Sequence, residues 1–121
     1  TIIDGSHNQD GAIVLNQYLS KKSLGKWNII IGMLNNREVK DFVKIFKSHI
    51  NQIYAVTIPK STNSHSALDI KYKLDTLGFD TNVSNTLEDA IIKADNKIPL
   101  LITGSLYLAG HALKFNETTI D

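Results

Sequence analysis

The sequence contains no cysteine, which excludes disulfides, thiolate metal sites and a cysteine nucleophile. It also lacks a charge surplus, because 13 basic side chains nearly balance 12 acidic ones. A dedicated nucleic-acid-binding protein needs a clear basic excess to meet phosphate groups, so we expect no nucleic-acid partner. No apolar run approaches the roughly 20 residues that cross a bilayer, so we expect no membrane partner either.

What remains is the composition of one globular domain. The chain has 121 residues, of which 42% are hydrophobic and 21% are charged, and these values exclude intrinsic disorder. This length supports one core but is short for a complete two-substrate enzyme. Because the chain begins at Thr1 rather than Met, we expect residues 1–121 to be a single domain of a larger protein.

Short apolar runs alternate with stretches of helical periodicity, which is the pattern of βα units around a parallel sheet. The clearest strand is Trp27–Ile31, whose unbroken isoleucines predict burial on both faces of the sheet. We expect the other strands at about residues 1–3, 52–57, 81–83 and 99–103, and helices at about 9–19, 39–50, 67–77, 87–94 and 106–113. The fold class is therefore α/β, a three-layer domain with a mostly parallel sheet and helices on both faces.

Helix boundaries are marked by short polar side chains and by glycine. Asn8, Ser66 and Thr86 are predicted N-caps, because their side-chain oxygens can accept from free backbone N–H groups. Gly78 is expected just past the end of the third helix. The tail from residue 115 to residue 121 carries no strong signal.

Three strand ends carry glycine junctions, and these predict the place of the functional site. They are Asp4-Gly5, Gly32-Met33 and Thr103-Gly104-Ser105. Parallel strands have their carboxyl ends on one edge of a sheet, and ligands of open α/β folds bind at that edge. We therefore expect the three junctions to meet there.

The segment after the first strand offers the richest chemistry. Asp4 can accept hydrogen bonds from ribose hydroxyls or hold His7 in one tautomer. His7 can bind an anion or transfer a proton near neutral pH, and the following helix start favours an anion. The alternative is a capped turn in which Asp4 and Asn8 serve the backbone and His7 is merely exposed.

The remaining candidates are weaker. Ser105 places a hydroxyl at another helix start, where an N-cap role alone is the favoured interpretation. His49, at the end of a helix, and His111, within one, are interpreted as structural. His65 lies on a polar loop at the expected edge, and its role stays open.

Several nucleotide and metal motifs are absent. The sequence holds no G-x-x-x-x-G-K-[ST], because Gly25-Lys26 is followed by Trp27. It holds no G-x-G-x-x-G after the first strand and no H-E-x-x-H. The chain therefore offers neither a P-loop nor a dinucleotide fingerprint, and we expect no metal site within it.

Three stretches match a known family in order and spacing. Asp4–Ala12 is similar to D-G-A-H-N-P-x-A/G-A, Ile31–Glu38 to G-M-L-x-D-K-D/E, and Thr103–Gly110 to T/C-G-S-L-Y-L-x-G. The chain resembles, over essentially its whole length, the C-terminal domain of folylpolyglutamate synthase/dihydrofolate synthase, in the Mur ligase superfamily. The resemblance implies a Rossmann-like domain of a cytoplasmic ligase of folate biosynthesis and one-carbon metabolism.

The activity that the resemblance implies is an ATP-dependent ligation through an acyl phosphate. ATP phosphorylates the carboxylate of dihydropteroate or folate, and the amine of L-glutamate attacks the product. ATP and Mg²⁺ are expected mainly on the central P-loop domain that precedes this one, so the isolated chain is expected to be inactive. By position in the motifs, Asp4 matches the nucleotide-contacting aspartate, His7 a catalytic and glutamate-binding histidine, and Ser105 a glutamate-binding serine.

The sequence departs from the family pattern at a few positions. Ser6 stands for the usual alanine and Gln9 for the usual proline. Asn36-Arg37 replaces Asp-Lys, which removes a carboxylate and changes the shape of a cation.

Three alternatives stay open. A peptidoglycan Mur ligase is the near one, although the G-M-L and G-S-L-Y-L stretches favour the folate branch. A non-catalytic flavodoxin-like or receiver-like binding module has similar length and alternation, but the third and fifth predicted strands lack the Asp and Lys of a receiver. The third alternative is an inactive isolated piece of a ligase. The sequence does not decide between dihydropteroate and folate as the acceptor of glutamate.

Overall fold

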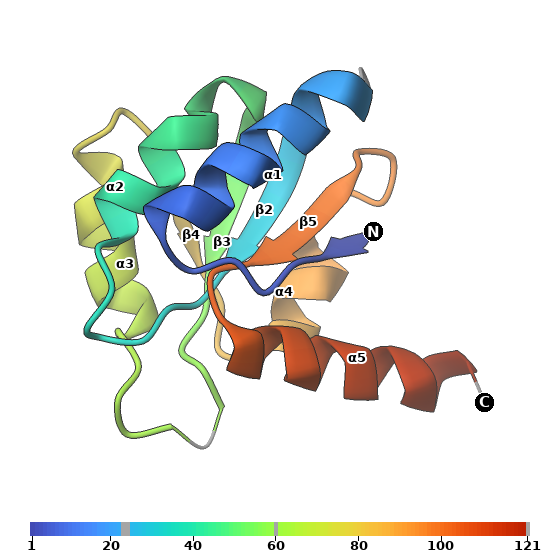
Figure 1. The fold of residues 1–121 in the computed structure, drawn as a ribbon. Coiled ribbons are helices and arrows are strands. Elements are labelled where there is room, and N and C mark those ends of the chain that lie inside the picture. Colours follow the sequence, from blue (N-terminus) through green and yellow to red (C-terminus); the bar gives the residue numbers. More distant parts are fainter. Residues whose placement is uncertain (23–24, 60, 121) are drawn as a thin grey trace.

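The computed structural model describes residues 1–22, 25–59 and 61–120, with side chains described up to residue 114. Strands and helices alternate along the chain, as predicted (Figure 1). The elements in chain order are β1 (Ile2–Ile3), α1 (Gln9–Lys22), β2 (Trp27–Ile31), α2 (Val39–Val43), the 3₁₀ helix η1 (Lys44–His49), β3 (Ile50–Ala55), α3 (Ala67–Asp75), β4 (Asn82–Val83), α4 (Leu87–Lys93), β5 (Leu100–Thr103) and α5 (Leu106–Ile120).

The sheet has five strands in the order β1-β5-β2-β3-β4, and all four pairings are parallel. The chain runs outward from β2 through β3 to β4, then crosses back to insert β5 between β1 and β2. The order therefore reverses at β5. Ligands of such sheets bind where the order switches, so this topology points to the loops after β1, β2 and β5.

Helices cover both faces of the sheet, which gives the predicted three layers (Figure 1). The helices α1, α2 and α3 pack with η1 on one face, and α4 and α5 pack on the other. Successive side chains of a strand point to opposite faces. Ile29 and Ile31 accordingly belong to the first core, and Ile30 belongs to the second. All five residues of β2 are buried, as the isoleucine run predicted.

Local capping chemistry sets the helix starts as predicted. The Asn8 side chain accepts from the Gly11 N–H at 2.9 Å. The hydroxyls of Ser66 and Thr86 each accept from a backbone N–H three residues later, at 3.1 and 3.0 Å. Each bond satisfies a donor that the helix itself leaves free.

The predicted helix over residues 39–50 is wrong in its second half. The α-helix ends at Val43, η1 follows, and Phe46 takes non-helical angles of φ −112° and ψ 22°. Ile50 begins β3 and pairs with Trp27 instead of continuing the helix. Phe46 still packs edge-to-face on Phe42 at 5.3 Å, so burial of the same side chains explains the helix-like spacing.

Other elements also differ from the prediction at their ends. The third strand spans residues 50–55 rather than 52–57, and α1 runs on to Lys22 rather than Leu19. The last helix extends to Ile120, beyond the predicted end at Leu113. Among the residues of α5 up to position 114, whose burial is described, the last buried one is Ala112, but no glycine or proline follows in the sequence to end the helix.

Candidate functional site at the carboxyl edge of the sheet

The loops after β1, β2 and β5 meet, as the glycine junctions predicted. The Gly104 N–H donates to the Ser6 carbonyl at 3.0 Å, which ties the loop after β5 to the loop after β1. Gly104 has φ +109°, and a Cβ at this position would lie 2.6 Å from the Gly32 carbonyl oxygen. Only glycine allows the loop after β2 to approach so closely.

Asp4 joins the ends of β1 and β5. Its Oδ2 accepts from the Ser6 N–H at 3.0 Å and from the Thr103 hydroxyl at 2.9 Å. The alternative that Asp4 orients His7 is not borne out, because Asp4 bonds the turn and Thr103 while the His7 ring bonds another group. Asp4 does not line either of the two pockets that are described below.

A backbone carbonyl orients His7 instead. His7 Nδ1 lies 3.0 Å from the Gly5 carbonyl oxygen. A carbonyl only accepts, so Nδ1 carries the hydrogen, and Nε2 of the neutral ring is an acceptor. The side chain is half-buried and lines the two pockets that are described below.

Ser105 is the N-cap of α5, as the favoured interpretation of the sequence had it. Its Oγ accepts from the Tyr107 N–H at 3.0 Å and from the Leu108 N–H at 3.4 Å. The residue is buried, yet it lines the same cleft as His7. Both bonds use the oxygen as acceptor, which leaves the hydroxyl hydrogen to donate.

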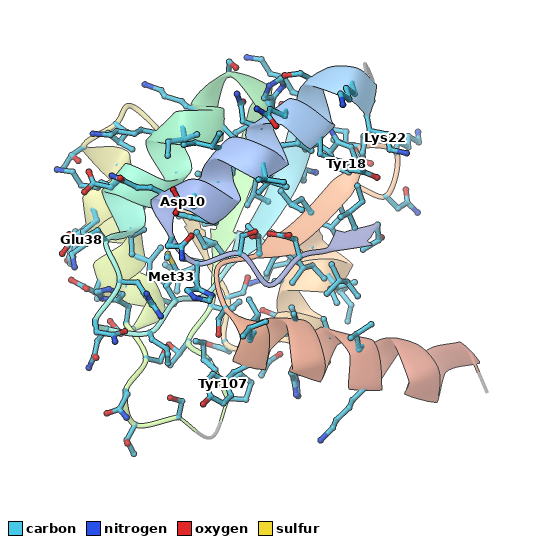
Figure 2. The ribbon with its side chains drawn as sticks, viewed as in Figure 1. Asp10, Tyr18, Lys22, Met33, Glu38 and Tyr107 are labelled. Atoms are coloured by element: carbon cyan, nitrogen blue, oxygen red, sulfur yellow. The ribbon has the colours of Figure 1, made fainter. Side chains whose placement is uncertain are left out.

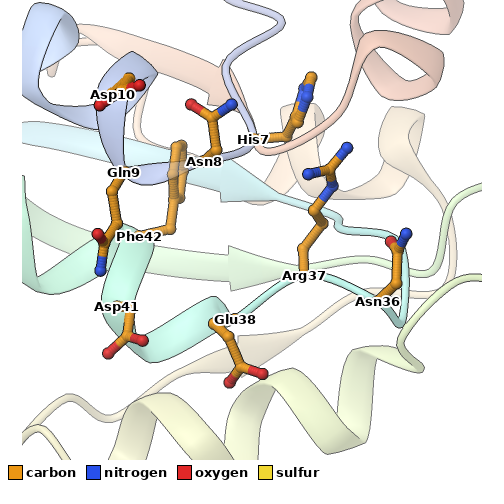
Figure 3. Close-up of a pocket in the computed structure, with 9 residues that line it drawn as sticks. All are labelled: His7, Asn8, Gln9, Asp10, Asn36, Arg37, Glu38, Asp41 and Phe42. Carbon is orange, nitrogen blue, oxygen red and sulfur yellow. The ribbon is translucent and has the colours of Figure 1, made fainter.

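Arg37 is the member of the site that sequence reasoning missed. It follows β2 and lines both pockets together with His7. Figure 3 shows its side chain reaching toward the turn that carries His7 and Asn8. Its Nε is buried and, within the part of the chain that the structure describes, has no hydrogen-bond partner. The available signal was a cation in a loop directly after a fully buried strand.

Two adjoining pockets share His7 and Arg37. The smaller, of about 280 Å³, is lined by residues of all three loops and the start of α5: His7, Leu34, Arg37, Gly104, Ser105, Leu106 and Tyr107. We call it the central cleft. The larger, of about 370 Å³, runs toward α1 and α2 and adds the carboxylates of Asp10, Glu38 and Asp41 (Figure 3). Both pockets therefore contain the cationic Arg37, and the larger pocket also has an acidic rim.

Tyr107 marks the outer wall of the central cleft. It stands on the first turn of α5 beside the loop after β3 (Figure 2), and its side chain is 67% exposed. Leu106 next to it is 66% exposed. The mouth of the cleft therefore combines an exposed aromatic ring with an exposed aliphatic side chain.

The other three histidines lie outside the two pockets. His49 pairs with the Ser20 hydroxyl at 3.1 Å, at the end of η1. His111 meets Glu88 at 2.8 Å between α5 and α4. The pKa of Glu88 is lowered, first by its own backbone N–H and also by His111. The interpretation of these two histidines as structural agrees with these contacts. His65 is buried between two loops and α3.

Among the described residues, no group of three or more His, Asp or Glu side chains is placed to hold a metal ion. Within those same ranges, no helix combines the length and apolar character needed to cross a bilayer.

Comparisons with known proteins agree on one family. The family model for the dihydrofolate synthetase C-terminal domain matches residues 1–115. No curated protein sequence matches the chain significantly.

Solved structures share the fold at low identity. Mycobacterium tuberculosis folylpolyglutamate synthase complexed with ADP and AMPPCP superposes with a TM-score of 0.82 at 20% identity, over 92% of this chain and 28% of that one. Escherichia coli FolC with DHPP and ADP gives 0.80 at 18%, over 97% and 28%. The bifunctional folylpolyglutamate synthase/dihydrofolate synthase of Yersinia pestis with AMPPNP and Mn ion gives 0.77 at 18%, over 93% and 27%. The chain therefore spans less than a third of the length of each.

Proposed function

Because the chain belongs to the family of dihydrofolate synthetase C-terminal domains, we propose that residues 1–121 form the C-terminal domain of an ATP-dependent ligase. The ligase adds L-glutamate to dihydropteroate, to folates or to both, through an acyl phosphate. A preceding domain with a P-loop is its partner in the same protein, and the cytoplasm is its location. This chain covers 28% of the length of two of the solved structures, which supports the division of the ligase into this domain and a preceding one.

The observation that carries the proposal is the convergence of His7, Arg37 and Ser105 on the central cleft. L-Glutamate brings two carboxylates and an ammonium group. Arg37 presents a planar fork of donors that suits a carboxylate. The N-terminus of α5, a helix of 15 residues, adds positive potential on the same side.

Each side chain has a role that its hydrogen bonds allow. The ammonium of glutamate must lose a proton before its nitrogen can attack, and Nε2 of His7 is an acceptor that can take it. The hydroxyl of Ser105 has its hydrogen left to donate to a carboxylate. Asp4 uses Oδ2 within the fold, so its contact to the nucleotide would be made by Oδ1.

The chemistry then follows from these positions. The carboxylate of the folate substrate accepts the γ-phosphoryl group of ATP, and the nitrogen of glutamate bonds to the activated carbon as phosphate leaves. Closure of this domain over its partner excludes water from an acyl phosphate that water would destroy. Mg²⁺, which would neutralise phosphate charge when bound, is assigned in this proposal to the preceding P-loop domain.

The first test uses the complete gene product that carries this chain. We expect ADP release that depends on L-glutamate and on dihydropteroate or a folate. His7→Ala should lower kcat by about 10²- to 10⁴-fold, the usual contribution of a positioned acid or base. His49→Ala is the matched control, because His49 lies outside both pockets. Glutamate-independent turnover, or equal effects of the two substitutions, would count against the proposal.

The second test separates binding from capping at Ser105. Ser105→Ala and Ser66→Ala each remove an N-cap hydroxyl and should each lower the free energy of unfolding by about 1 kcal/mol. Only Ser105→Ala should raise the KM for glutamate, by about tenfold to a hundredfold for one bond to a charged group. A change confined to the KM for ATP would move Ser105 to the nucleotide site.

A further inference from the structure

The loop that carries Arg37 is fastened to the loop after β3. Leu34 and Ser64 form an antiparallel bridge, and the His65 N–H donates to the Met33 carbonyl at 2.8 Å. The Asn35 N–H donates to the neighbouring loop as well, at 2.6 Å. These backbone bonds fix the start of the Arg37 loop. At Arg37 itself, the N–H donates to the Leu34 carbonyl within the loop at 3.0 Å, and the Arg37 carbonyl is bonded by a side chain from outside the loop.

That side chain is His65, which is only 7% exposed. Its Nε2 lies 2.9 Å from the Arg37 carbonyl oxygen, and its Nδ1 lies 2.9 Å from Oδ2 of Asp69. A carbonyl oxygen only accepts, and so does an ionised carboxylate. Both ring nitrogens must therefore donate, and a ring with two N–H groups is an imidazolium.

The surroundings keep the proton on the ring rather than on the carboxylate. Lys73 Nζ lies 3.2 Å from the same Oδ2 of Asp69. This hydrogen bond is the largest cause that lowers the pKa of Asp69, and the bond from His65 lowers it further. Asp69 thus stays an acceptor, and the ring must supply the hydrogen between them.

We propose that His65 is a positioning residue that works as an imidazolium and holds the Arg37 backbone in place, so that the Arg37 side chain faces the central cleft. The role of the cleft rests on the proposed function, but the protonation and the tether do not. Loss of either ring proton sets a nitrogen lone pair against an oxygen lone pair and releases one of the two bonds.

The charged groups around the ring are few. On α3 they are Asp69, which bonds the ring, and Lys73, which reaches it through Asp69. The loop after β2 carries Arg37 and Glu38 beside the bonded carbonyl. Arg37 stays cationic over the whole range in which proteins fold. His7 also faces Arg37 across the central cleft, so the two histidines must be told apart by their own ring signals.

The direct test is ¹⁵N NMR of the histidine rings of the 121-residue chain at about neutral pH. We expect both nitrogens of His65 to show the protonated type and to couple to hydrogens. His7 is the internal comparison, because its Nδ1 donates to one carbonyl and its Nε2 faces the cleft. A pyridine-type nitrogen in His65, with Asp69 ionised in the same spectra, would overturn the proposal.

Two variants separate positioning from simple packing. His65→Gln leaves one amide group for two acceptors, so exchange of the Arg37 backbone N–H, which donates to the Leu34 carbonyl at 3.0 Å, should speed up by about tenfold, the factor expected when the bond from His65 to the Arg37 carbonyl is lost. Asp69→Asn supplies an amide donor toward Nδ1, so a neutral His65 can keep its bond to Arg37. Exchange at Arg37 should then stay slow and become independent of ring protonation. A merely structural role predicts faster exchange in both variants, and that result would refute the tether.

Titration with L-glutamate distinguishes this proposal from the proposed function. If glutamate leaves the Arg37 Nε signal unchanged while His65 is doubly protonated, the proposed glutamate site at Arg37 is refuted and the tether by His65 is supported. If glutamate shifts the Arg37 signal but His65→Gln leaves exchange of the Arg37 N–H unchanged, the tether by His65 is refuted and the glutamate site is supported.

Discussion

Gly104→Ala tests whether the loops after β2 and β5 are joined as tightly as the geometry requires. Gly104 has φ +109°, a conformation that residues with a Cβ rarely adopt. A Cβ added there would lie 2.6 Å from the Gly32 carbonyl oxygen, 2.9 Å from Met33 Cγ and 3.0 Å from Ile31 Cγ1. The first of these is a backbone atom next to a buried strand, so it cannot move without moving β2.

The cost has two parts. Holding a residue with a Cβ in such a backbone conformation costs roughly 1–3 kcal/mol. Crowding a packed site by one methyl group costs roughly 1–3 kcal/mol. Alanine also reduces the entropy of the unfolded chain, which returns about 0.4–1 kcal/mol. The free energy of unfolding should therefore fall by about 1–5.5 kcal/mol.

Urea and thermal unfolding of the chain measure this change. At about 2.1 cal/mol/K per residue, the 121 residues have an unfolding entropy of about 0.25 kcal/mol/K. The expected loss then lowers Tm by about 4–22 °C. Gly110→Ala is the matched control, because a Cβ there meets nothing within 4 Å and the residue lies inside α5. It should raise stability by about 0.5–1 kcal/mol, since alanine is the better helix former.

Gly104→Ala and Gly110→Ala should change the free energy of unfolding in opposite directions, so comparing them isolates the effect of the contact at Gly104. If Gly104→Ala unfolds within about 0.5 kcal/mol of the parent chain, the range of ordinary surface substitutions, the two loops are not in contact as described. The shared edge of His7, Arg37 and Ser105 would then lack its geometric basis.

Three more predictions concern stability. Phe46→Ala should lower the free energy of unfolding by about 3–5 kcal/mol in urea titrations, because the side chain is fully buried, whereas Tyr72→Ala, at a residue 65% exposed, should change it by less than about 0.5 kcal/mol. Asn8→Ala removes the cap of α1 and should cost about 1 kcal/mol in the same assay; no loss would mean that water replaces the cap. The pKa of Asp75 is held below its ordinary value of 3.8, first by the Thr81 N–H. The stability that this carboxylate gives is therefore complete above that ordinary value and is lost as the pH falls through the lower folded value. Urea midpoints of Asp75→Asn should fall less steeply in acid than those of the parent chain, and parallel curves would contradict this.

The sequence predicted those parts of the fold that depend on neighbouring residues. The isoleucine run of Trp27–Ile31 identified the buried strand, and its bounds are confirmed. The caps at Asn8, Ser66 and Thr86 were found because a cap involves residues three positions apart. The helix expected over residues 39–50 failed because its apolar spacing reflects burial, and burial alone does not distinguish a helix from a 3₁₀ turn that leads into a strand.

The sequence likewise predicted some features of the candidate site and not others. His7 and Ser105 were identified from their loops, and the expected convergence of the three loops is confirmed. The alternative partner of His7 was wrong, because Asp4 bonds instead to Thr103, a residue 99 positions away. Arg37 was missed because nothing in its own segment shows that its Nε is buried beside the cleft.

By itself, then, the sequence determined the alternation of strands and helices, the caps that start the helices and the loops that carry polar chemistry. These features follow from hydrogen bonds and periodicities within a few residues. Only the tertiary structure decided which atoms of those loops are already used. The two acceptors of His65 come from segments 28 and 4 residues away, and they meet only because β3 pairs with β2 and α3 packs against the loop that follows. The tether is thus a consequence of strand order, because the sheet brings the Arg37 carbonyl to a ring that Asp69, four residues further along the same segment, also bonds.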